Sequence, residues 1–346
     1  MEKEINKKDT VILSEKSNQP RISVIIPCRN EEDFIGSCLK SILANDYPKD
    51  KLEVLVVDGI SEDRTRKTVE DIAVGFPYLK ILENPKKITP VALNIGIKSA
   101  SGEIVMKMDA HTIYESDYIS KCVFYLDKYQ ADNVGGVLVT LPIKNTREAK
   151  AVAFCLSHRF GSGNSYFRTG TKKPRWVDTV TFGCFKKEIF RKIGFYDENM
   201  VRSQDSEFNH RIKKVGGRIL LVPDIVAYYY PKSTFKEFFW HNFADGVWLT
   251  YPLKFGKIVF SWRHLVPVGF VLCLSSLLIL GFFEKAFLLG FSFVLSLYLL
   301  ASLFFAFKIS LREKEINYIY LMPISFTVRH FGYGLGSLWG IIKIFI

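Results

Sequence analysis

Residues 103–111 read EIVMKMDAH, and this stretch decides the fold prediction. Its first six residues, 103–108, have the continuous apolar character of a buried parallel strand. Asp109 and His111 follow just beyond the carboxyl end, where open α/β sheets bind their ligands. A carboxylate and an imidazole could together hold a divalent metal against a diphosphate. A capped strand end followed by a surface turn is the competing interpretation, and the neighbouring motifs decide between them.

Short apolar runs alternate with amphipathic stretches on both sides of this strand. The pattern predicts further strands at 22–27, 52–57, 78–82, 133–140 and 218–222. It predicts helices at 31–43, 61–74, 89–100, 117–129, 186–193 and 204–215. Strands rich in β-branched residues that alternate with helices indicate a mainly parallel sheet covered on both faces.

The overall charge narrows the class of partner. The 346 residues carry a formal net charge of +12, which suits nucleic acid, anionic membrane surfaces or phosphate-bearing substrates. Because the sequence has no zinc-finger or RNP signature, we expect no nucleic acid and favour a membrane. The six cysteines form no CxxC pair, which is typical of reduced, individually buried thiols. Residues 1–20 are polar without a signal-peptide core, so they predict a flexible tail and a cytoplasmic catalytic part.

The composition changes at about residue 232. Residues 232–264 mix aromatic and basic side chains, which suits an amphipathic segment in the lipid headgroup region. Two apolar runs, 265–283 and 286–307, approach the ~20 residues of a membrane helix and predict a tight hairpin. A buried hairpin of a soluble protein is the alternative. Basic residues on both sides of the hairpin place its two ends in the cytoplasm.

A third apolar stretch, 316–346, is interrupted by Pro323, Arg329 and His330. It could span the membrane, re-enter it or lie at its surface. Glycines recur at intervals of four, at 332, 336 and 340, which puts small residues on one helix face and favours close packing. The region 265–346 is therefore predicted as a multi-pass membrane region.

Polar motifs follow the predicted strands. PCRNEE (27–32) follows the first and VDGISEDRT (57–65) ends the second, where Asp58 could accept a hydrogen bond from a ribose or base. Gly59 would permit a tight turn, and Ser61 or Asp63 could equally cap a helix. Downstream, Asp205 is a candidate general base. The acidic pair Asp205 and Glu207 could instead be a first helical turn favoured by the helix dipole.

The ordered motifs resemble those of family 2 glycosyltransferases with a GT-A fold, and within the family the membrane-associated ExoA-type enzymes of succinoglycan biosynthesis. The resemblance covers about 21–251. It is carried by PCRNEE (27–32), VVDGISEDRT (56–65), NPKKITPVALNIGI (84–97), ASGEIVMKMDAH (100–111), VDTVTFGCFKKEIF (177–190), GFYDENMVRSQDSEFNHR (194–211) and GGRILLVPDIVAYY (216–229).

The resemblance implies roles for individual residues. Nucleotide-sugar binding falls to Pro27, Arg29, Glu31, Asp58 and Asp109, metal binding to Asp109 and His111, and deprotonation of the acceptor hydroxyl to Asp205. It also implies a nucleotide-sugar donor, by family habit a UDP-sugar, and an inverting transfer. A divalent cation, Mn²⁺ or Mg²⁺, would neutralise the leaving diphosphate.

Two departures from the family pattern matter. His111 replaces the second acid of a DxD motif, and imidazole suits Mn²⁺ better than Mg²⁺. The Gln-x-x-Arg-Trp motif of processive synthases is missing after Asp205, which predicts the addition of one sugar per binding event. Candidate contacts to the acceptor or its phosphate are Lys172, Lys173, Arg175 and Glu207; an exposed basic loop is the alternative for the first three.

The sequence thus predicts a tail (1–20), a GT-A domain (21–231), an interfacial segment (232–264) and a membrane region (265–346). The expected function is an inverting glycosyltransferase that uses a polyprenyl-linked saccharide at the cell membrane. The alternatives are a transferase that uses the polyprenyl phosphate itself, and a catalytically silent nucleotide-binding scaffold. A dinucleotide oxidoreductase is excluded because no G-x-G-x-x-G follows the first strand.

Overall fold

Nine strands form one mixed sheet within residues 19–346, the part of the chain that the computed structural model describes. They are β1 (Ile22–Cys28), β2 (Leu52–Asp58), β3 (Leu79–Glu83), β4 (Ile104–Lys107), β5 (Thr112–Tyr114), β6 (Asn133–Thr140), β7 (Arg175–Val177), β8 (Cys184–Lys186) and β9 (Ile219–Tyr229). Their order is β3-β2-β1-β4-β8-β6-β9-β5, and β7 pairs with β9. Of the predicted tail 1–20, residues 1–18 lie outside the described residues.

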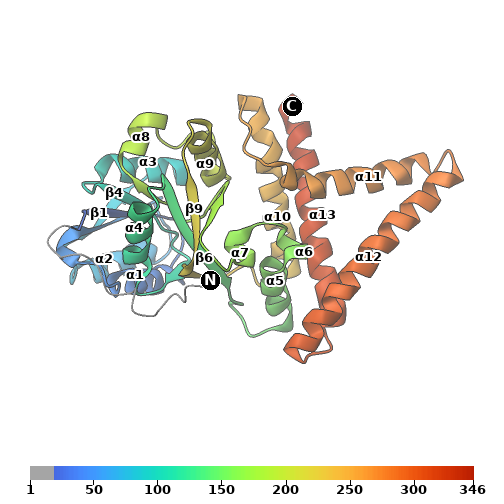
Figure 1. Ribbon diagram of the computed structural model, residues 1–346, viewed down its shortest axis with the longest axis horizontal. Coiled ribbons are helices and arrows are strands. Elements are labelled where there is room, and N and C mark those ends of the chain that lie inside the picture. The colour runs from blue at the N-terminus through green and yellow to red at the C-terminus, as the bar shows by residue number, and fades with distance from the viewer. Residues whose placement is uncertain (1–18) are drawn as a thin grey trace, which may run out of the picture.

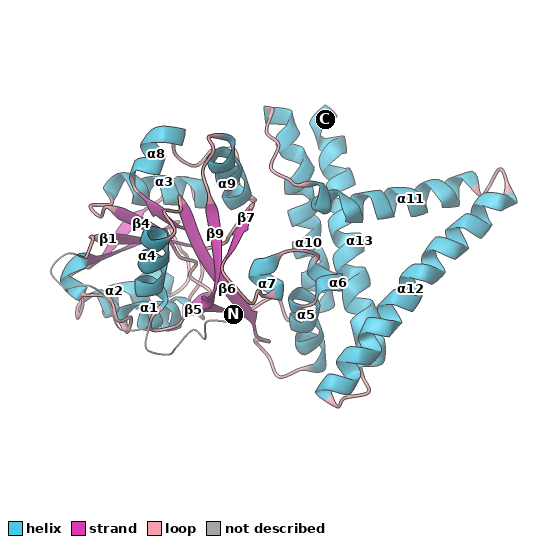
Figure 2. Cartoon of the chain, viewed as in Figure 1, coloured by secondary structure: helices cyan, strands magenta, loops and turns pink. Residues whose placement is uncertain are grey.

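The first half of the sheet is parallel. β1 pairs in parallel with β2 and β4, and β3 extends this half beyond β2. β8 joins the two halves, because it runs antiparallel to both β4 and β6. The carboxyl ends of β1, β2 and β4 therefore meet at one edge, which we call the carboxyl edge. The predicted α/β fold is confirmed (Figure 2).

Helices cover both faces of the sheet. They are α1 (Ile35–Leu43), α2 (Thr65–Ala73), α3 (Thr89–Ser99), α4 (Tyr118–Lys128), α8 (Glu188–Ile193) and α9 (Gln204–Lys214). Successive side chains of a strand point to opposite faces, and β1 follows this rule. Ile22, Val24 and Ile26 join the core under α1 and α4, whereas Ile25 joins the core under α3, α8 and α9.

Some elements differ from the sequence prediction. The helix expected at 31–43 begins only at Ile35, since the preceding residues form a loop. Three strands, β5, β7 and β8, were not predicted, because three residues each are too few to show a period. The helices α5 (Arg147–Ser157), α6 (Arg159–Ser162) and α7 (Tyr166–Thr169) were also missed, and they lie between the sheet and the C-terminal helices (Figure 1).

Four helices follow the sheet: α10 (Phe235–Thr250), α11 (Val266–Leu280), α12 (Lys285–Glu313) and α13 (Tyr318–Phe345). Two helical stretches among residues 19–346, Trp262–Leu280 and Lys285–Glu313, are long and apolar enough to cross a membrane. Few of their residues are buried, and Phe282 and Phe283 at the turn between them are 84% exposed. An exposed apolar surface of this extent is typical of a site that contacts a membrane or another protein.

A short turn joins α11 and α12, as the predicted hairpin requires, but the two helices do not pair closely along their length. α11 and α12 diverge from this turn, and α13 crosses the open side of the wedge (Figure 1). α12 and α13 also join a core with α5 and α10, in which Cys155 and Phe238 pack with Met322 and Phe326. The C-terminal helices are thus fixed to the sheet domain by apolar packing.

The third apolar stretch forms a single helix, α13, with Pro323 inside it. Its glycines pack against α10: a Cβ atom at Gly336 would lie 2.0 Å from the carbonyl oxygen of Phe243, and one at Gly340 would lie 2.3 Å from Thr250 Oγ1. The close helix packing predicted from the glycine repeat is confirmed. The glycines set how near α10 can come to α13.

Gly336→Ala is expected to force α13 away from α10 and to lower the free energy of unfolding by about 1–3 kcal/mol. The measurement is the thermal unfolding midpoint of the full chain in detergent. Gly269→Ala is the matched control, because a Cβ atom at Gly269 on α11 meets no atom within 4 Å. Alanine is the better helix former at both positions, so the control should be neutral or stabilising. Equal midpoints for the two variants would contradict this packing account.

Candidate active site

The loops that follow β1 and β2 hold each other at the carboxyl edge. Asp58, the last residue of β2, accepts hydrogen bonds from the amide and the hydroxyl of Ser61, the latter at 2.5 Å. The Ser61 hydroxyl accepts from the amide of Asn30 at 3.0 Å, and Asn30 Oδ1 accepts from the amide of Glu62 at 2.9 Å. Ile60, not Gly59, takes the positive φ of 55°. Strain at a β-branched residue is unusual and concentrates at functional sites.

Lys107, the last residue of β4, lies between two carboxylates. Its Nζ is 2.5 Å from Asp205 Oδ2 and 3.4 Å from Asp109 Oδ1. The Lys107 side chain is 5% exposed, and each carboxylate is 27% exposed. Burial lowers the pKa of Lys107, but the two carboxylates outweigh burial and raise this pKa above the ordinary lysine value. Lys107 therefore stays cationic at the centre of the site.

Asp205 is the candidate general base. Burial raises the pKa of its carboxyl above the ordinary value, and the Lys107 ammonium partly offsets this. A carboxyl whose pKa is raised but which still ionises can accept a proton more readily than an exposed one. Ser203, two residues before it, has a positive φ of 59° and starts the helix α9.

Asp109 and His111 are the candidate metal ligands. His111 Nδ1 is 3.1 Å from Glu31 Oε1, which orients the ring and leaves Nε2 for a ligand. Among residues 19–346, no three His, Cys, Asp or Glu side chains surround one metal position. Mg²⁺-type sites use one or two protein ligands and complete their shell with phosphate and water oxygens. One carboxylate and one imidazole therefore fit a cation that is completed by a bound diphosphate.

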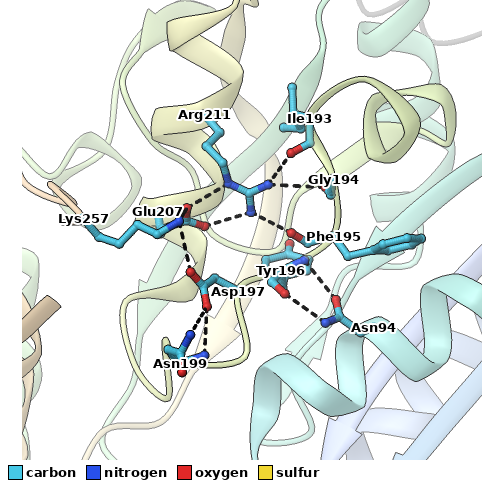
Figure 3. A network of polar contacts seen from close by, with 10 residues as sticks. All are labelled: Asn94, Ile193, Gly194, Phe195, Tyr196, Asp197, Asn199, Glu207, Arg211 and Lys257. Atoms are coloured by element: carbon cyan, nitrogen blue, oxygen red, sulfur yellow. Dashed lines mark hydrogen bonds and ion pairs between the residues drawn. The ribbon is translucent and has the colours of Figure 1, made fainter. Parts of the chain in front are cut away.

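A hydrogen-bond network anchors the helix that carries Asp205 (Figure 3). Arg211 on α9 donates to both carboxylate oxygens of Glu207, each at 2.8 Å. The same guanidinium donates to the carbonyl oxygens of Ile193 at 2.6 Å and Phe195 at 2.8 Å. Glu207 thus fixes α9 to the end of α8 instead of facing a ligand.

The same network reaches two other elements (Figure 3). The amide of Tyr196 donates to Asn94 Oδ1, and Asn94 Nδ2 donates back to the carbonyl of Tyr196, both at 2.9 Å. Lys257 Nζ lies 3.0 Å from Asp197 and 3.7 Å from Glu207. Asp205 is therefore held by α3 on one side and by the segment between α10 and α11 on the other.

A cavity of about 1000 Å³ runs from the carboxyl edge to the C-terminal helices. Its lining includes residues at or just beyond the carboxyl ends of β1, β2 and β4, namely Pro27, Arg29, Glu31, Gly59, Asp109 and His111. Farther along, it includes Asp205 and, from the C-terminal helices, His241, Asp245, Val266, Phe270, Tyr298, Arg329 and His330. One space of this size can enclose a small-molecule ligand together with part of a second one.

The structure brings most of the residues predicted from the motifs into this cavity, namely Pro27, Arg29, Glu31, Asp109, His111 and Asp205. Asp58 is 1% exposed and acts on the loop through Ser61. Arg175 stacks on the ring of Tyr166 at 3.9 Å, and like Lys172, Lys173 and Glu207 it is not among the residues that line the cavity. The spacing of these residues along the chain did not indicate which of them would line the cavity and which would lie outside it.

Sequence reasoning missed several residues of the cavity wall. Lys107 was read as part of a strand, although a lysine inside the apolar run IVMKM is a signal of a buried charge with a function. Arg168, Arg202 and Arg329 come from three distant segments and meet only in the folded chain. Arg329 could have been recognised as a candidate functional residue, because it is a charged residue inside an apolar helix.

Comparison with known proteins adds independent information. Residues 23–194 match the family model described as Glycosyl transferase family 2. A Methanococcus voltae protein named dolichyl N-acetyl-alpha-D-glucosaminyl phosphate 3-beta-D-2,3-diacetamido-2,3-dideoxy-beta-D-glucuronosyltransferase is 28% identical over 330 residues, which cover 93% of this chain and 97% of that protein. The succinoglycan biosynthesis protein ExoA of Rhizobium meliloti is 27% identical and covers 71% of this chain, with 81% of its own length aligned.

A solved structure supports the fold over nearly the whole chain. The mannosyltransferase PcManGT of Pyrobaculum calidifontis, determined with GDP-Man and Mn²⁺, superposes with a TM-score of 0.61 at 22% sequence identity. The similarity covers 94% of this chain and 89% of that one, so it includes the C-terminal helices as well as the sheet domain.

Proposed function

Since the chain belongs to glycosyl transferase family 2, as its motifs predict and the family model confirms, we propose that it transfers one sugar, with inversion, from a nucleotide-sugar donor to a lipid-linked saccharide. One observation carries this proposal. Asp109, His111 and Asp205 line the same cavity as Val266 and Tyr298, which lie in Trp262–Leu280 and Lys285–Glu313, the two described helical stretches long and apolar enough to cross a membrane. The two relatives, named for a dolichyl-phosphate-linked sugar and for succinoglycan synthesis, support the same class of acceptor.

The donor fits the carboxyl-edge end of the cavity. Pro27, Arg29 and Glu31 line this end, and Arg29 supplies a cation there. Asp109 and His111 would hold a divalent cation, which neutralises the charge on the nucleoside diphosphate as the glycosidic bond breaks. We favour a UDP-sugar as donor, which is what the family resemblance implies. We favour Mn²⁺ as the cation, because an imidazole ligand suits Mn²⁺ better than Mg²⁺.

Asp205 acts as the general base in this proposal. It removes the proton from the acceptor hydroxyl as the oxygen attacks the anomeric carbon opposite the leaving diphosphate. Lys107 positions Asp205 by the 2.5 Å contact and keeps its carboxylate ionised. A single in-line displacement needs no covalent enzyme intermediate.

The membrane would hold the acceptor within reach. α11 and α12 expose apolar surface to their surroundings, and basic residues lie at both ends of the pair, with Lys254 before α11 and Lys308 and Arg312 near the end of α12. Positive charge at both ends favours a multi-pass arrangement with the catalytic domain in the cytoplasm. A polyprenyl-linked saccharide presents its reactive sugar at this surface.

Nucleoside diphosphate release tests the proposed function. The full chain in detergent is given a panel of nucleotide sugars with Mn²⁺ or Mg²⁺ and an extract of polyprenyl-linked saccharides. We expect release that needs one particular nucleotide sugar and also needs the acceptor extract. If the chain binds nucleotide sugars but releases no nucleoside diphosphate with any of them and any acceptor extract, the result would contradict a transferase. It would favour the catalytically silent scaffold.

A further inference from the structure

The end of the cavity nearest the C-terminal helices carries an excess of positive charge. Its lining there includes six cationic residues, Arg159, Arg168, Arg202, Lys232, Arg263 and Arg329, but a single carboxylate, Asp245. Arg202 pairs with Asp245 at 2.8 Å, and Arg263 pairs with Asp178 at 2.8 Å. The other four cations form no ion pair with any described residue. Such an excess recognises an anion.

Arg168 and Arg329 are the two cations best placed to bind it. The Arg168 guanidinium lies 5.0 Å from the ring centroid of Tyr229, and its Nη1 is buried without a hydrogen-bond partner among residues 19–346. Arg329 donates through Nε to the carbonyl of Gly161 at 2.5 Å and through Nη1 to Asn242 Oδ1 at 2.9 Å. Its Nη2 has no described partner. A half-buried arginine with unused donors matches the oxygens of a phosphate.

Beyond these arginines the cavity wall is apolar. Phe270 of α11 and Tyr298 of α12 pack with ring centroids 4.7 Å apart. The polar atoms of this wall satisfy one another, because the Tyr298 hydroxyl bonds to His330 Nδ1 at 3.0 Å and His330 Nε2 bonds to the carbonyl of Phe160 at 2.9 Å. Val266, which is 58% exposed, also lines this end.

We propose that Arg168 and Arg329 bind the phosphate that links the acceptor saccharide to its lipid, and that Val266, Phe270 and Tyr298 receive the first isoprenoid units. The inference rests on the proposed function and deepens it. The saccharide then extends from this phosphate toward Asp205 through one continuous cavity, and the chain leaves between α11 and α12. The donor diphosphate lies at the opposite end, beside Asp109.

Binding of farnesyl diphosphate to the full chain in detergent, measured by calorimetry, tests the phosphate half of the site. Arg168→Gln is expected to weaken this binding by about tenfold or more, since a charged hydrogen-bond donor is lost. Arg329→Lys, which retains the charge but not the fork of donors, should also weaken it. Arg175→Gln, an exposed arginine outside the cavity, is the matched control and should bind normally. Binding of UDP and GDP should be unchanged in every variant.

A tryptophan placed on α11 tests the apolar half. Val266→Trp should weaken farnesyl diphosphate binding but leave inorganic pyrophosphate binding unchanged, because it fills the space for the chain. Leu272→Trp, at another exposed position of α11 that does not line the cavity, is the control. Phosphatidylglycerol micelles should fail to displace farnesyl diphosphate; displacement at equal concentration would mean a general anionic-lipid site and would overturn the inference.

The two proposals can fail separately. Normal farnesyl diphosphate binding by both Arg168→Gln and Arg329→Lys, in a protein that transfers sugar, would overturn the acceptor site alone. Arginine-dependent binding in a protein that transfers no sugar would overturn the proposed function alone.

Discussion

Asp205→Asn is expected to lower kcat for sugar transfer by about 10²–10⁴-fold, the usual contribution of a general base. The substitution retains the size of the side chain but removes its ability to take the acceptor proton. Binding of the nucleoside diphosphate should be unchanged, because the donor lies at the carboxyl-edge end of the cavity. The measurement is the rate of nucleoside diphosphate release at saturating donor and acceptor.

Glu207→Gln is the control for this variant. Glu207 lies in the same turn of α9, but its carboxylate is 4% exposed and binds Arg211, so it should affect folding stability and not kcat. A lower unfolding midpoint with nearly normal kcat is the expected result. Equal losses of kcat in the two variants would mean that Asp205 acts by supporting α9, and the base would have to be sought elsewhere.

Lys107→Met is expected to have the second large effect, visible in the pH dependence of kcat. Burial already raises the pKa of Asp205, and Lys107 opposes that rise. Without the ammonium, the Asp205 carboxyl faces Asp109 with no cation between them, so its pKa should rise further. Because a general base works only when ionised, the acidic limb of the profile should move to higher pH and activity at neutral pH should fall.

The control for this prediction is Lys107→Arg, which retains the positive charge. Its acidic limb should stay close to that of the native chain, even if its larger head group lowers kcat. If the acidic limb of the pH profile of kcat stays at the same pH in Lys107→Met, the ionisation of the general base does not depend on Lys107.

The sequence predicted the parts of the fold that are set by local patterns. β1, β2 and β6 were found because their apolar runs are long, and Asp109, His111 and Asp205 because they follow such runs or begin a helix. β8 was missed, because only tertiary pairing inserts three residues between β4 and β6. The parallel half of the sheet was therefore easier to predict than the rest.

The far end of the cavity could not be predicted, for a physical reason. Arg168 and Arg329 are far apart in the chain, and they line one cavity only in the folded molecule. Arg329 lies on α13, whose glycines pack closely against α10 and which shares a core with α5. The local sequence around either arginine does not indicate that the two line the same cavity. Glu207 shows the opposite case: its partner Arg211 is four residues away, so the i,i+4 pair could have been recognised from the sequence.

Mass analysis of the lipid product tests the central claim most directly. The full chain is incubated with its nucleotide sugar and two separate acceptors, a polyprenyl-linked saccharide and the bare polyprenyl phosphate. The account predicts that the linked saccharide gains the mass of one sugar, with the anomeric configuration inverted, and that Asp205→Asn forms no such product. A sugar added to the bare polyprenyl phosphate instead, or several sugars added in one binding event, would contradict it.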